Sequence, residues 1–252
     1  MKSLIRFGVL LGLLSANLFL SPSLPSRLVS SSWWGTPAAM ALTEAEILEK
    51  LNSVLVFAVT DSNGAPLVAT MEAESTASVA GVFISRQDAI TFVDNLKQQN
   101  PDLASAVQVT PVPLGQVYKM SLNASEIQFD YVPVQQQVNS ARELLNQQEF
   151  SGVPLFIAKQ NTSEGGYLTI QRGEQEVIPF FFHKEDLQGM LENFKAQQPD
   201  LISSVEIDVV SLEGLLQTFQ QEDDQFLNRI VLIPPRETIQ FIESLRQQQQ
   251  GN

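Results

Sequence analysis

An internal repeat is the feature of this sequence that most constrains how the chain can fold. The tripeptide Pro101-Asp102-Leu103 returns as Pro199-Asp200-Leu201, at an offset of 98 residues. Further pairs recur on both sides of it, some with small shifts in offset: Val56-Phe57/Leu155-Phe156, Asn95/Asn193, Lys97/Lys195, Gln99/Gln197, Val107/Val205, Val109/Ile207, Val112/Val210, Leu114/Leu212 and Val132-Pro133/Ile233-Pro234. The unit of about 95 residues has the size of a half-domain and not of a solenoid repeat. The sequence therefore predicts two pseudosymmetric half-domains related by a pseudo-twofold axis.

The first 41 residues read as a secretory signal peptide. Lys2 and Arg6 precede a mainly apolar run, Phe7–Leu20, which is too short to cross a bilayer. Ala39-Met40-Ala41 has the small-residue pattern of a signal-peptidase site. We expect the mature chain to begin at Leu42, and a retained membrane anchor is the alternative. The domain boundaries predicted from the repeat are then 1–41 for the signal peptide, 42–148 for a leading helix and the first repeat, and 149–252 for the second repeat.

The charge of the chain excludes several classes of partner. The formal net charge is −13, and it becomes more negative if residues 1–41 are removed, because they contain three basic residues and no acidic one. A chain this acidic does not bind phosphate backbones or anionic lipid headgroups, so we expect no nucleic-acid partner and no stable membrane insertion. It contains no Cys, so its stability must come from an apolar core, which a chain of this length can form.

The pattern of apolar residues predicts the same series of elements in both repeats, and hence an α+β fold. A helix over 42–52 comes first, with Thr43 and Glu46 in a capping-box pattern. Strands are predicted over 54–60, 67–71, 79–84, 107–112 and 127–132, and over 153–158, 167–170, 177–182, 205–210 and 230–233. Helices are predicted over 85–99, from 114, over 138–145, after 182, from 212 and over 239–245, whereas 135–137 and 247–250 are predicted as a loop and a frayed tail.

Two apolar patterns predict where the core lies. The third strand of each repeat is apolar on both faces, so Phe180, Phe181 and Phe182 are expected in the core. Pro179 predicts an edge or a bulge in that strand. The helix that follows carries an apolar stripe at the same four positions in both repeats: Ala89, Phe92, Val93 and Leu96, and Leu187, Met190, Leu191 and Phe194.

The residues that carry chemistry are mostly missing. His183 aligns with the predicted helix cap Ser85, and no Cys or G-x-S-x-G motif could supply a nucleophile beside it. A metal site would need further imidazole or thiolate ligands. Glu222-Asp223-Asp224 lacks the spacing of a calcium loop and reads as a solvated loop. We therefore expect no enzyme activity, no metal and no cofactor.

Four stretches resemble one protein family. They are VAGVFISRQDAITFVDNLKQQNPDL (79–103), VTPVPLGQVYKM (109–120), VPLFIA (153–158) and VLIPPRETIQFIESL (231–245). They are similar to the soluble twenty-two-kilodalton component of the Tic protein-import translocon and its cyanobacterial relatives, over nearly the whole mature chain. The family has no consensus catalytic residues, so none are carried over.

The resemblance implies a chaperone-like carrier of unfolded proteins. Its plastid members lie between the envelope membranes, and its cyanobacterial members lie in the periplasm, with the thylakoid lumen as a second location, and serve outer-membrane biogenesis. The implied partners are unfolded or outer-membrane client proteins, and components of a translocon or of outer-membrane assembly. The alternatives are an exported scaffold that binds one fixed partner, and a hydrolase with an unrecognised carboxylate pair.

Two apolar residues lie off the predicted helix stripes and are the candidates for a client-binding groove. Ile90 lies about 100° from the centre of its stripe, and its counterpart in the repeat is Gln188. Phe241 lies just outside the stripe of Ile239, Ile242 and Leu245. The alternative is that both side chains pack against the other half of the molecule.

The signal-peptide interpretation has a direct test. Mass spectrometry of the protein isolated from its native compartment should give an N-terminus at Leu42, because cleavage follows the small residues 39–41. A cytoplasmic protein that still begins near Met1 would contradict the prediction.

Overall fold

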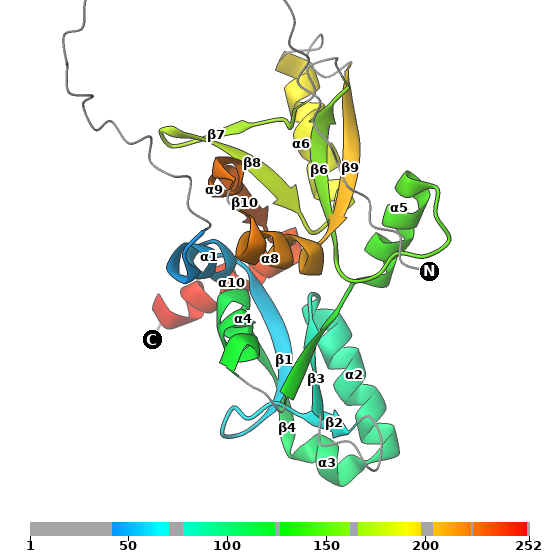
Figure 1. Ribbon diagram of the computed structural model, residues 1–252. Coiled ribbons are helices and arrows are strands. Elements are labelled where there is room, and N and C mark those ends of the chain that lie inside the picture. The colour runs from blue at the N-terminus through cyan, green and yellow to red at the C-terminus, as the bar shows by residue number, and fades with distance from the viewer. Residues whose placement is uncertain are drawn as a thin grey trace, which may run out of the picture. The chain divides into compact units, whose positions relative to one another are not determined.

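The computed structural model describes residues 42–70, 78–123, 127–161, 166–197, 204–222 and 224–250. The predicted signal peptide lies outside these residues, as do Asp223 and the second copy of the Pro-Asp-Leu tripeptide. The elements of the first repeat (Figure 1) are α1 (Glu44–Asn52), β1 (Leu55–Asp61), β2 (Val68–Thr70), β3 (Ser78–Phe83), α2 (Arg86–Gln99), α3 (Pro101–Ser105), β4 (Val107–Pro113), α4 (Leu114–Asn123), β5 (Ile127–Val132) and α5 (Gln135–Leu145).

The second repeat contains a second set of strands and helices. They are β6 (Pro154–Gln160), β7 (Ile170–Arg172), β8 (Gln175–Phe181), α6 (Lys184–Gln197), β9 (Val205–Ser211), α8 (Leu212–Gln221), α9 (Gln225–Arg229), β10 (Ile230–Ile233) and α10 (Arg236–Gln250).

The two five-stranded sheets have the same connections. In the first, β3 pairs antiparallel with β1 and β2 and parallel with β5, and β4 pairs antiparallel with β1. In the second, β8 pairs antiparallel with β6 and β7 and parallel with β10, and β9 pairs antiparallel with β6. The molecule is therefore a mixed α+β protein, as the sequence predicts.

Local signals in the sequence set the ends of several helices. The capping box at α1 forms as predicted: the Glu46 backbone N–H donates to the Thr43 hydroxyl, and the Glu46 carboxylate accepts from the Thr43 backbone N–H. At α2, the Ser85 hydroxyl accepts a hydrogen bond from the Asp88 backbone N–H. Between β1 and β2, Gly64 turns the chain at a φ of 84°, which glycine adopts without strain.

The predicted core is largely confirmed. Phe180, Phe181 and Phe182 are all buried. Ala89 and Leu187, which begin the two helix stripes, are both fully buried. The other stripe residues are less buried than predicted: Phe92 is 41% exposed, and Val93, Leu96, Met190, Leu191 and Phe194 are partly buried. The Phe92 ring lies against the ring of Phe83, with 5.4 Å between the centroids, so one face contacts the protein and the other is open to solvent.

Some predicted elements are wrong. Residues 135–137 and 247–250 are helical, because the glutamines, which are good helix formers, extend α5 and α10. The second strand of the second repeat is β7, which begins only at Ile170. The sequence reasoning also missed α3, where Asn100 caps a short helix that has Pro at its first position.

Pro179 does not lie in an edge strand. β8 is an interior strand, with β10 on one side and β6 and β7 on the other. Pro179 falls between Val177, which pairs with β7, and Phe181, which pairs with β6. In the described sheet, Pro179 is paired with Val231 of β10 but with no residue of β6 or β7. Its missing N–H therefore leaves the hydrogen bonds of β8 to β6 and β7 intact.

The last helix of each repeat packs against the sheet of the other repeat. Ala141 of α5 belongs to the core of the second sheet, with Phe156 at its centre, and α5 contacts β6 and β9. In the reverse direction, Phe241 of α10 packs against the core around Phe57 of the first sheet. A third and larger core, which contains buried residues of both repeats, joins the halves.

Gln137 ties the two repeats together at a helix end. It is 3% exposed. Its Oε1 accepts from the Lys184 backbone N–H, the first of α6, at 3.0 Å, and its Nε2 donates to the Glu185 carboxylate at 2.7 Å. The N–H groups at a helix start have no partner within the helix. A side chain from the first repeat therefore supplies part of the cap of α6, next to His183, the residue that aligns with the cap Ser85 of α2.

Replacing Gln137 should weaken this connection. Gln137→Ala leaves the carboxylate and the N–H group without their buried partner, so the free energy of unfolding in urea should fall by about 1–3 kcal/mol. The matched control is Gln136→Ala, since Gln136 donates to the same carboxylate from an exposed position. The control should change stability by no more than about 0.5 kcal/mol. Equal effects of the two substitutions would contradict a capping role for Gln137.

Candidate functional site

One of the two predicted groove residues lines a surface hollow. The Phe241 hollow has a volume of about 340 Å³ and is lined by Phe57, Arg86, Gln87, Glu237, Thr238, Gln240 and Phe241. It lies where the start of α2, strand β1 and helix α10 meet. The sequence prediction thus falls at a place where both repeats contribute side chains to one concave surface.

Aromatic contacts place Phe241 in the wall of this hollow. The rings of Phe57 and Phe241 meet edge to face, with 5.8 Å between their centroids. The Arg86 guanidinium carbon lies 5.0 Å from the Phe241 ring centroid, within the range of a cation–π interaction. Phe57 is fully buried, whereas Phe241 is half-buried. Part of the Phe241 ring therefore packs against the other half of the molecule, as the alternative proposed, and the rest of the ring lines the hollow.

Thr238 gives the hollow an unusual polar group. The residue is 1% exposed, and its hydroxyl has no hydrogen-bond partner among the described residues. At the offset that pairs Pro133 with Pro234, Thr238 corresponds to Gln137. The longer Gln137 side chain, on α5 of the first repeat, reaches the start of α6 and accepts a hydrogen bond there. The shorter Thr238, on α10 of the second repeat, makes no such bond to the start of α2, where Arg86 and Gln87 line the hollow beside it.

The charges around the Phe241 hollow are mixed. Arg86 is basic, whereas Glu237 is acidic, and both line the hollow. Burial, together with the nearby Glu237 carboxylate, raises the pKa of Asp88 on α2. The hollow therefore has no strong preference for an anion, and its aromatic wall beside the Arg86 guanidinium group suits an apolar side chain next to a peptide oxygen.

Ile90 is not among the residues that line the hollow. It is half-buried on α2, one turn after Arg86 and so on the same side of that helix. The structure therefore places the two predicted residues on neighbouring helices, one inside the hollow and one beyond it.

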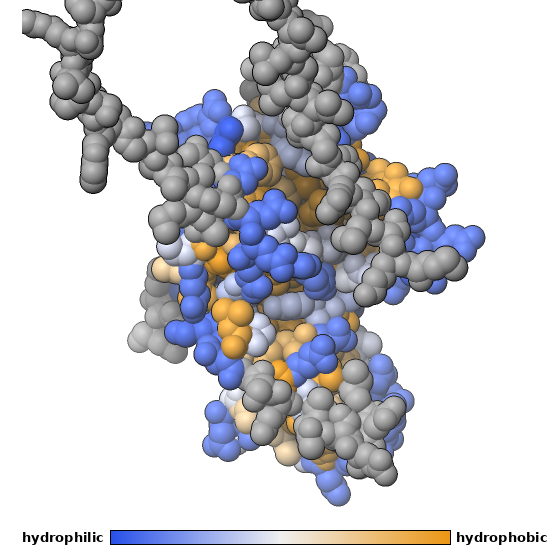
Figure 2. Space-filling model, in the orientation of Figure 1, coloured by the Kyte–Doolittle hydropathy of each residue, from blue (hydrophilic) through white to orange (hydrophobic). Residues whose placement is uncertain are grey.

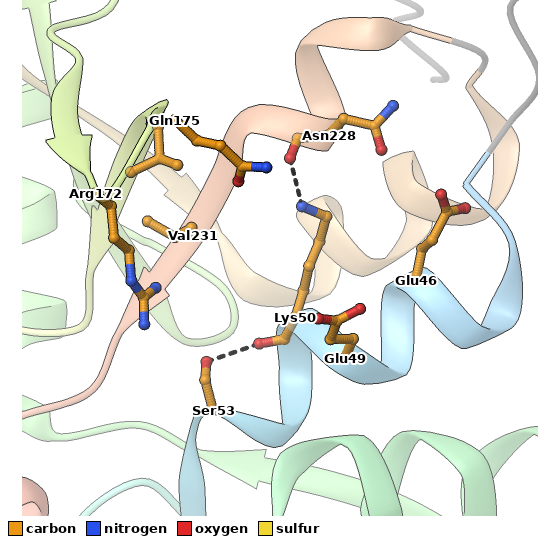
Figure 3. A pocket seen from close by; sticks show the side chains of 9 residues that line it. Glu46, Glu49, Lys50, Ser53, Arg172, Gln175, Asn228 and Val231 are labelled. Carbon is orange, nitrogen blue, oxygen red and sulfur yellow. Dashed lines mark hydrogen bonds between the residues drawn. The ribbon is translucent and has the colours of Figure 1, made fainter.

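A larger hollow of about 570 Å³ is mainly polar (Figure 3). The Lys50 hollow is lined by Glu46, Glu49, Lys50, Ser53, Arg172, Gln175, Val177, Asn228 and Val231. The lysine is hydrogen-bonded within the protein: Lys50 Nζ donates to the backbone oxygens of Asn228 at 2.7 Å and Ile230 at 3.1 Å. Burial lowers the pKa of Lys50, and Glu46 and Glu49 partly oppose this shift. The lysine thus holds α1 against β10.

A third hollow, of about 240 Å³, lies between the two repeats. The Tyr131 hollow is lined by Tyr118, Ser121, Phe129, Tyr131, Glu213, Leu216, Gln217 and Gln220. Burial raises the pKa of Tyr131 to about 12 and also raises the pKa of Glu213, whose carboxylate accepts from the Val153 backbone N–H at 3.0 and 3.2 Å.

The described residues offer little for catalysis or metal binding. Within them, no group of three or more His, Cys, Asp or Glu side chains could hold a metal ion. His183 directly precedes α6, and its Nε2 is buried without a hydrogen-bond partner among the described residues. Asp224, from the predicted acidic loop, caps α9 by accepting from the Phe226 backbone N–H. None of the described helices is long and apolar enough to cross a membrane.

The surface seen in Figure 2 mixes apolar and polar groups. Apolar patches are interspersed with polar side chains on this face. Among described residues, the large apolar side chains exposed to solvent are spread over several elements: Val68, Phe92, Leu103, Leu122, Leu144 and Ile239. The sequence did not indicate Arg86 and Thr238 as site residues, because neither departs from the apolar pattern of its helix. They come together only because α10 packs on the first sheet.

Comparisons with known proteins agree with one another. The profile of the Tic22-like family matches residues 1–244. "Protein TIC 22, chloroplastic" from Pisum sativum is 26% identical over 216 residues, covering 84% of this chain and 82% of the pea protein. The protein of the same name from Arabidopsis thaliana is also 26% identical over 216 residues, covering 84% of this chain and 75% of its own.

Two solved structures have similar folds. Anabaena Tic22, described as a protein of protein transport, superposes with a TM-score of 0.69 and 32% identity, covering 81% of this chain and 97% of its own. Tic22 from Plasmodium falciparum superposes with a TM-score of 0.65 and 20% identity, covering 79% of this chain and 97% of its own. The second likeness concerns the fold alone.

The unpaired hydroxyl of Thr238 can be tested by its removal. Thr238→Val keeps the shape of the side chain and deletes a buried polar group without a partner, so the free energy of unfolding should rise by about 1 kcal/mol. In the control Thr218→Val, the lost hydroxyl donates to the Gly214 backbone oxygen, and stability should not rise. A fall in stability for Thr238→Val would show that the hydroxyl is already hydrogen-bonded, through water held in the hollow.

Proposed function

The chain belongs to the Tic22-like family, and on that premise we propose that it is an exported, non-enzymatic, chaperone-like carrier of unfolded proteins. Its clients are outer-membrane or imported proteins, which it delivers to translocon or outer-membrane assembly components. It works in the periplasm, or in the thylakoid lumen, after removal of residues 1–41. The proposal takes 42–148 and 149–252 as two pseudosymmetric half-domains, a view supported by the matching connections of the two sheets.

The observation that carries the proposal is the Phe241 hollow. It offers part of the Phe241 ring and the Arg86 guanidinium group in one open depression. An extended client chain presents apolar side chains beside peptide oxygens, which the ring can contact and the guanidinium group can hydrogen-bond. Ile90, one turn along α2 from Arg86, extends the same surface.

Binding of this kind must be weak enough to release the client. Three or four apolar side chains contribute about 2 kcal/mol each, and association costs several kcal/mol. The remaining affinity is around micromolar, which suits a carrier that works without nucleotide hydrolysis. The net charge of −13 limits self-association while the apolar surface stays available.

Aggregation of an unfolded client tests the proposal. A urea-unfolded outer-membrane β-barrel protein is diluted into buffer with the mature protein and no nucleotide, and light scattering reports aggregation. The wild-type protein should suppress the scattering at micromolar concentration. Phe241→Ser combined with Ile90→Gln should lose most of this effect, because the apolar wall is removed.

Two further variants separate binding from folding. Gln240→Arg adds a charge at an exposed position in the wall of the hollow and should weaken suppression with little change in unfolding free energy. Leu103→Gln removes an exposed apolar side chain elsewhere and should leave suppression intact. A loss of 2–5 kcal/mol in stability for the double variant, with normal activity of Gln240→Arg, would show that Phe241 is only core and that clients bind elsewhere. Suppression of a single partner alone would favour a fixed-partner scaffold.

A further inference from the structure

Helix α1 fills a groove between the two repeats. It packs on α4 of the first repeat and on β10 of the second, and its apolar residues Ile47 and Leu51 are buried there. The contact with α4 is so close that a Cβ on Gly115 would collide with Asn52 of α1. Lys50 completes the site by donating to the backbone oxygens of Asn228 in α9 and of Ile230 at the start of β10, which is an edge strand of its sheet.

The repeat creates a second groove of the same kind, between α8 and β5. These elements correspond to α4 and β10, and they line the Tyr131 hollow. The burial of corresponding residues differs. Ile230 and Leu232 of β10, which lies under α1, are 1% and 2% exposed. Their counterparts Phe129 and Tyr131 of β5 are only partly buried.

Corresponding backbone N–H groups have different hydrogen-bond acceptors in the two grooves: the end of α1 in the first and the Glu213 carboxylate in the second. In the filled groove, the Val54 backbone N–H donates to the Leu51 oxygen of α1 at 3.1 Å. In the second groove, the corresponding Val153 N–H donates to Glu213, which stands at the position of Gly115. The helix that precedes Val153 in the chain is α5, and it packs on β6 and β9 instead. Among the described elements, α4 is the helix that contacts β5, and its Tyr118 and Ser121 form one wall of the Tyr131 hollow, whose other walls come from β5 and α8.

The charges of the two grooves differ in sign. Glu46 and Glu49 of α1 share the Lys50 hollow with Arg172 (Figure 3). In the Tyr131 hollow, Glu213 is the one charged residue among those that line it, and Asp130 of β5 is close enough to act on it electrostatically. A helix that enters this second groove therefore meets negative charge where α1 meets a guanidinium group.

We infer that the Tyr131 hollow is a docking site for a basic amphipathic helix of a transported protein. The helix would place two apolar residues, four positions apart, against Phe129, Tyr131 and Leu216, as α1 places Ile47 and Leu51 in its own groove. Lys or Arg side chains on it would face Glu213 and Asp130. The inference rests on the proposed function only in taking the partner to be a transported protein.

The test uses peptides based on α1 itself. The probe is a helix-stabilised, fluorescent peptide of residues 42–53 with Glu44→Lys, Glu46→Lys and Glu49→Lys. It should bind the mature protein with a Kd of about 10–100 µM, and added salt should weaken binding because the charges are screened. The unaltered acidic peptide, and a basic peptide that also carries Ile47→Ser and Leu51→Ser, should each bind about tenfold more weakly or worse.

Protein variants locate the site. Gln217→Arg places a like charge in the wall of the hollow, at an exposed position of α8, and should weaken the basic peptide about tenfold. Gln99→Arg, at the exposed end of α2, makes the same charge change elsewhere and should not. Amide chemical-shift changes on titration should concentrate at Tyr131 and Glu213 and spare Lys50.

Equal binding to Gln217→Arg and wild-type protein, or equal binding of the acidic and basic peptides, would overturn the inference. Its failure is distinguishable from failure of the carrier role. A Gln217→Arg protein that loses the peptide but still suppresses client aggregation supports two separate sites. A wild-type protein that binds the peptide but does not suppress aggregation keeps the docking site and overturns the carrier.

Discussion

The exchange of terminal helices between the repeats is the constraint on which the rest of the structure depends. Each sheet exposes one apolar face that its own repeat does not fully cover: Phe156 is covered with the help of α5, and Phe57 with the help of α10. Because neither sheet can bury its core alone, the halves form one cooperative body. The surfaces where an exchanged helix meets the other sheet are also where concave sites arise, since helix and sheet come from different repeats.

The two sheets have the same strand connections, but corresponding positions at their junctions carry different side chains. Gln137 of the first repeat forms a hydrogen-bonded junction with α6, whereas Thr238 of the second repeat lies beside a hollow at α2. Gly115 of the first repeat lies against α1, whereas Glu213 of the second repeat lines the Tyr131 hollow. Each kind of junction therefore occurs twice in the described chain, once with a hydrogen-bonded or packed arrangement and once beside a hollow.

Much of the fold could be predicted because it rests on local patterns. The capping box at Thr43, the apolar third strands and the order of elements all follow from neighbouring residues. The glutamine tracts at 135–137 and 247–250 were misjudged, since polarity was taken for disorder although Gln favours helices. The sequence predicted only one residue of the Phe241 hollow, because Phe241 is an aromatic residue outside the apolar stripe of its helix. Arg86 and Thr238, which line the same hollow, could not be predicted, because they come together only through a contact between the repeats that no local pattern encodes.

The contact of Lys50 with the backbone oxygens of Asn228 and Ile230 joins residues that are 178 and 180 positions apart in the chain. Together with the place of Phe241 against the first sheet, it means that the first half cannot complete its core until the last residues of the chain are present. Contacts this distant in sequence are formed late and slowly. A chain built in this way stays open while it is being synthesised, and it closes only when its C-terminal helix is available.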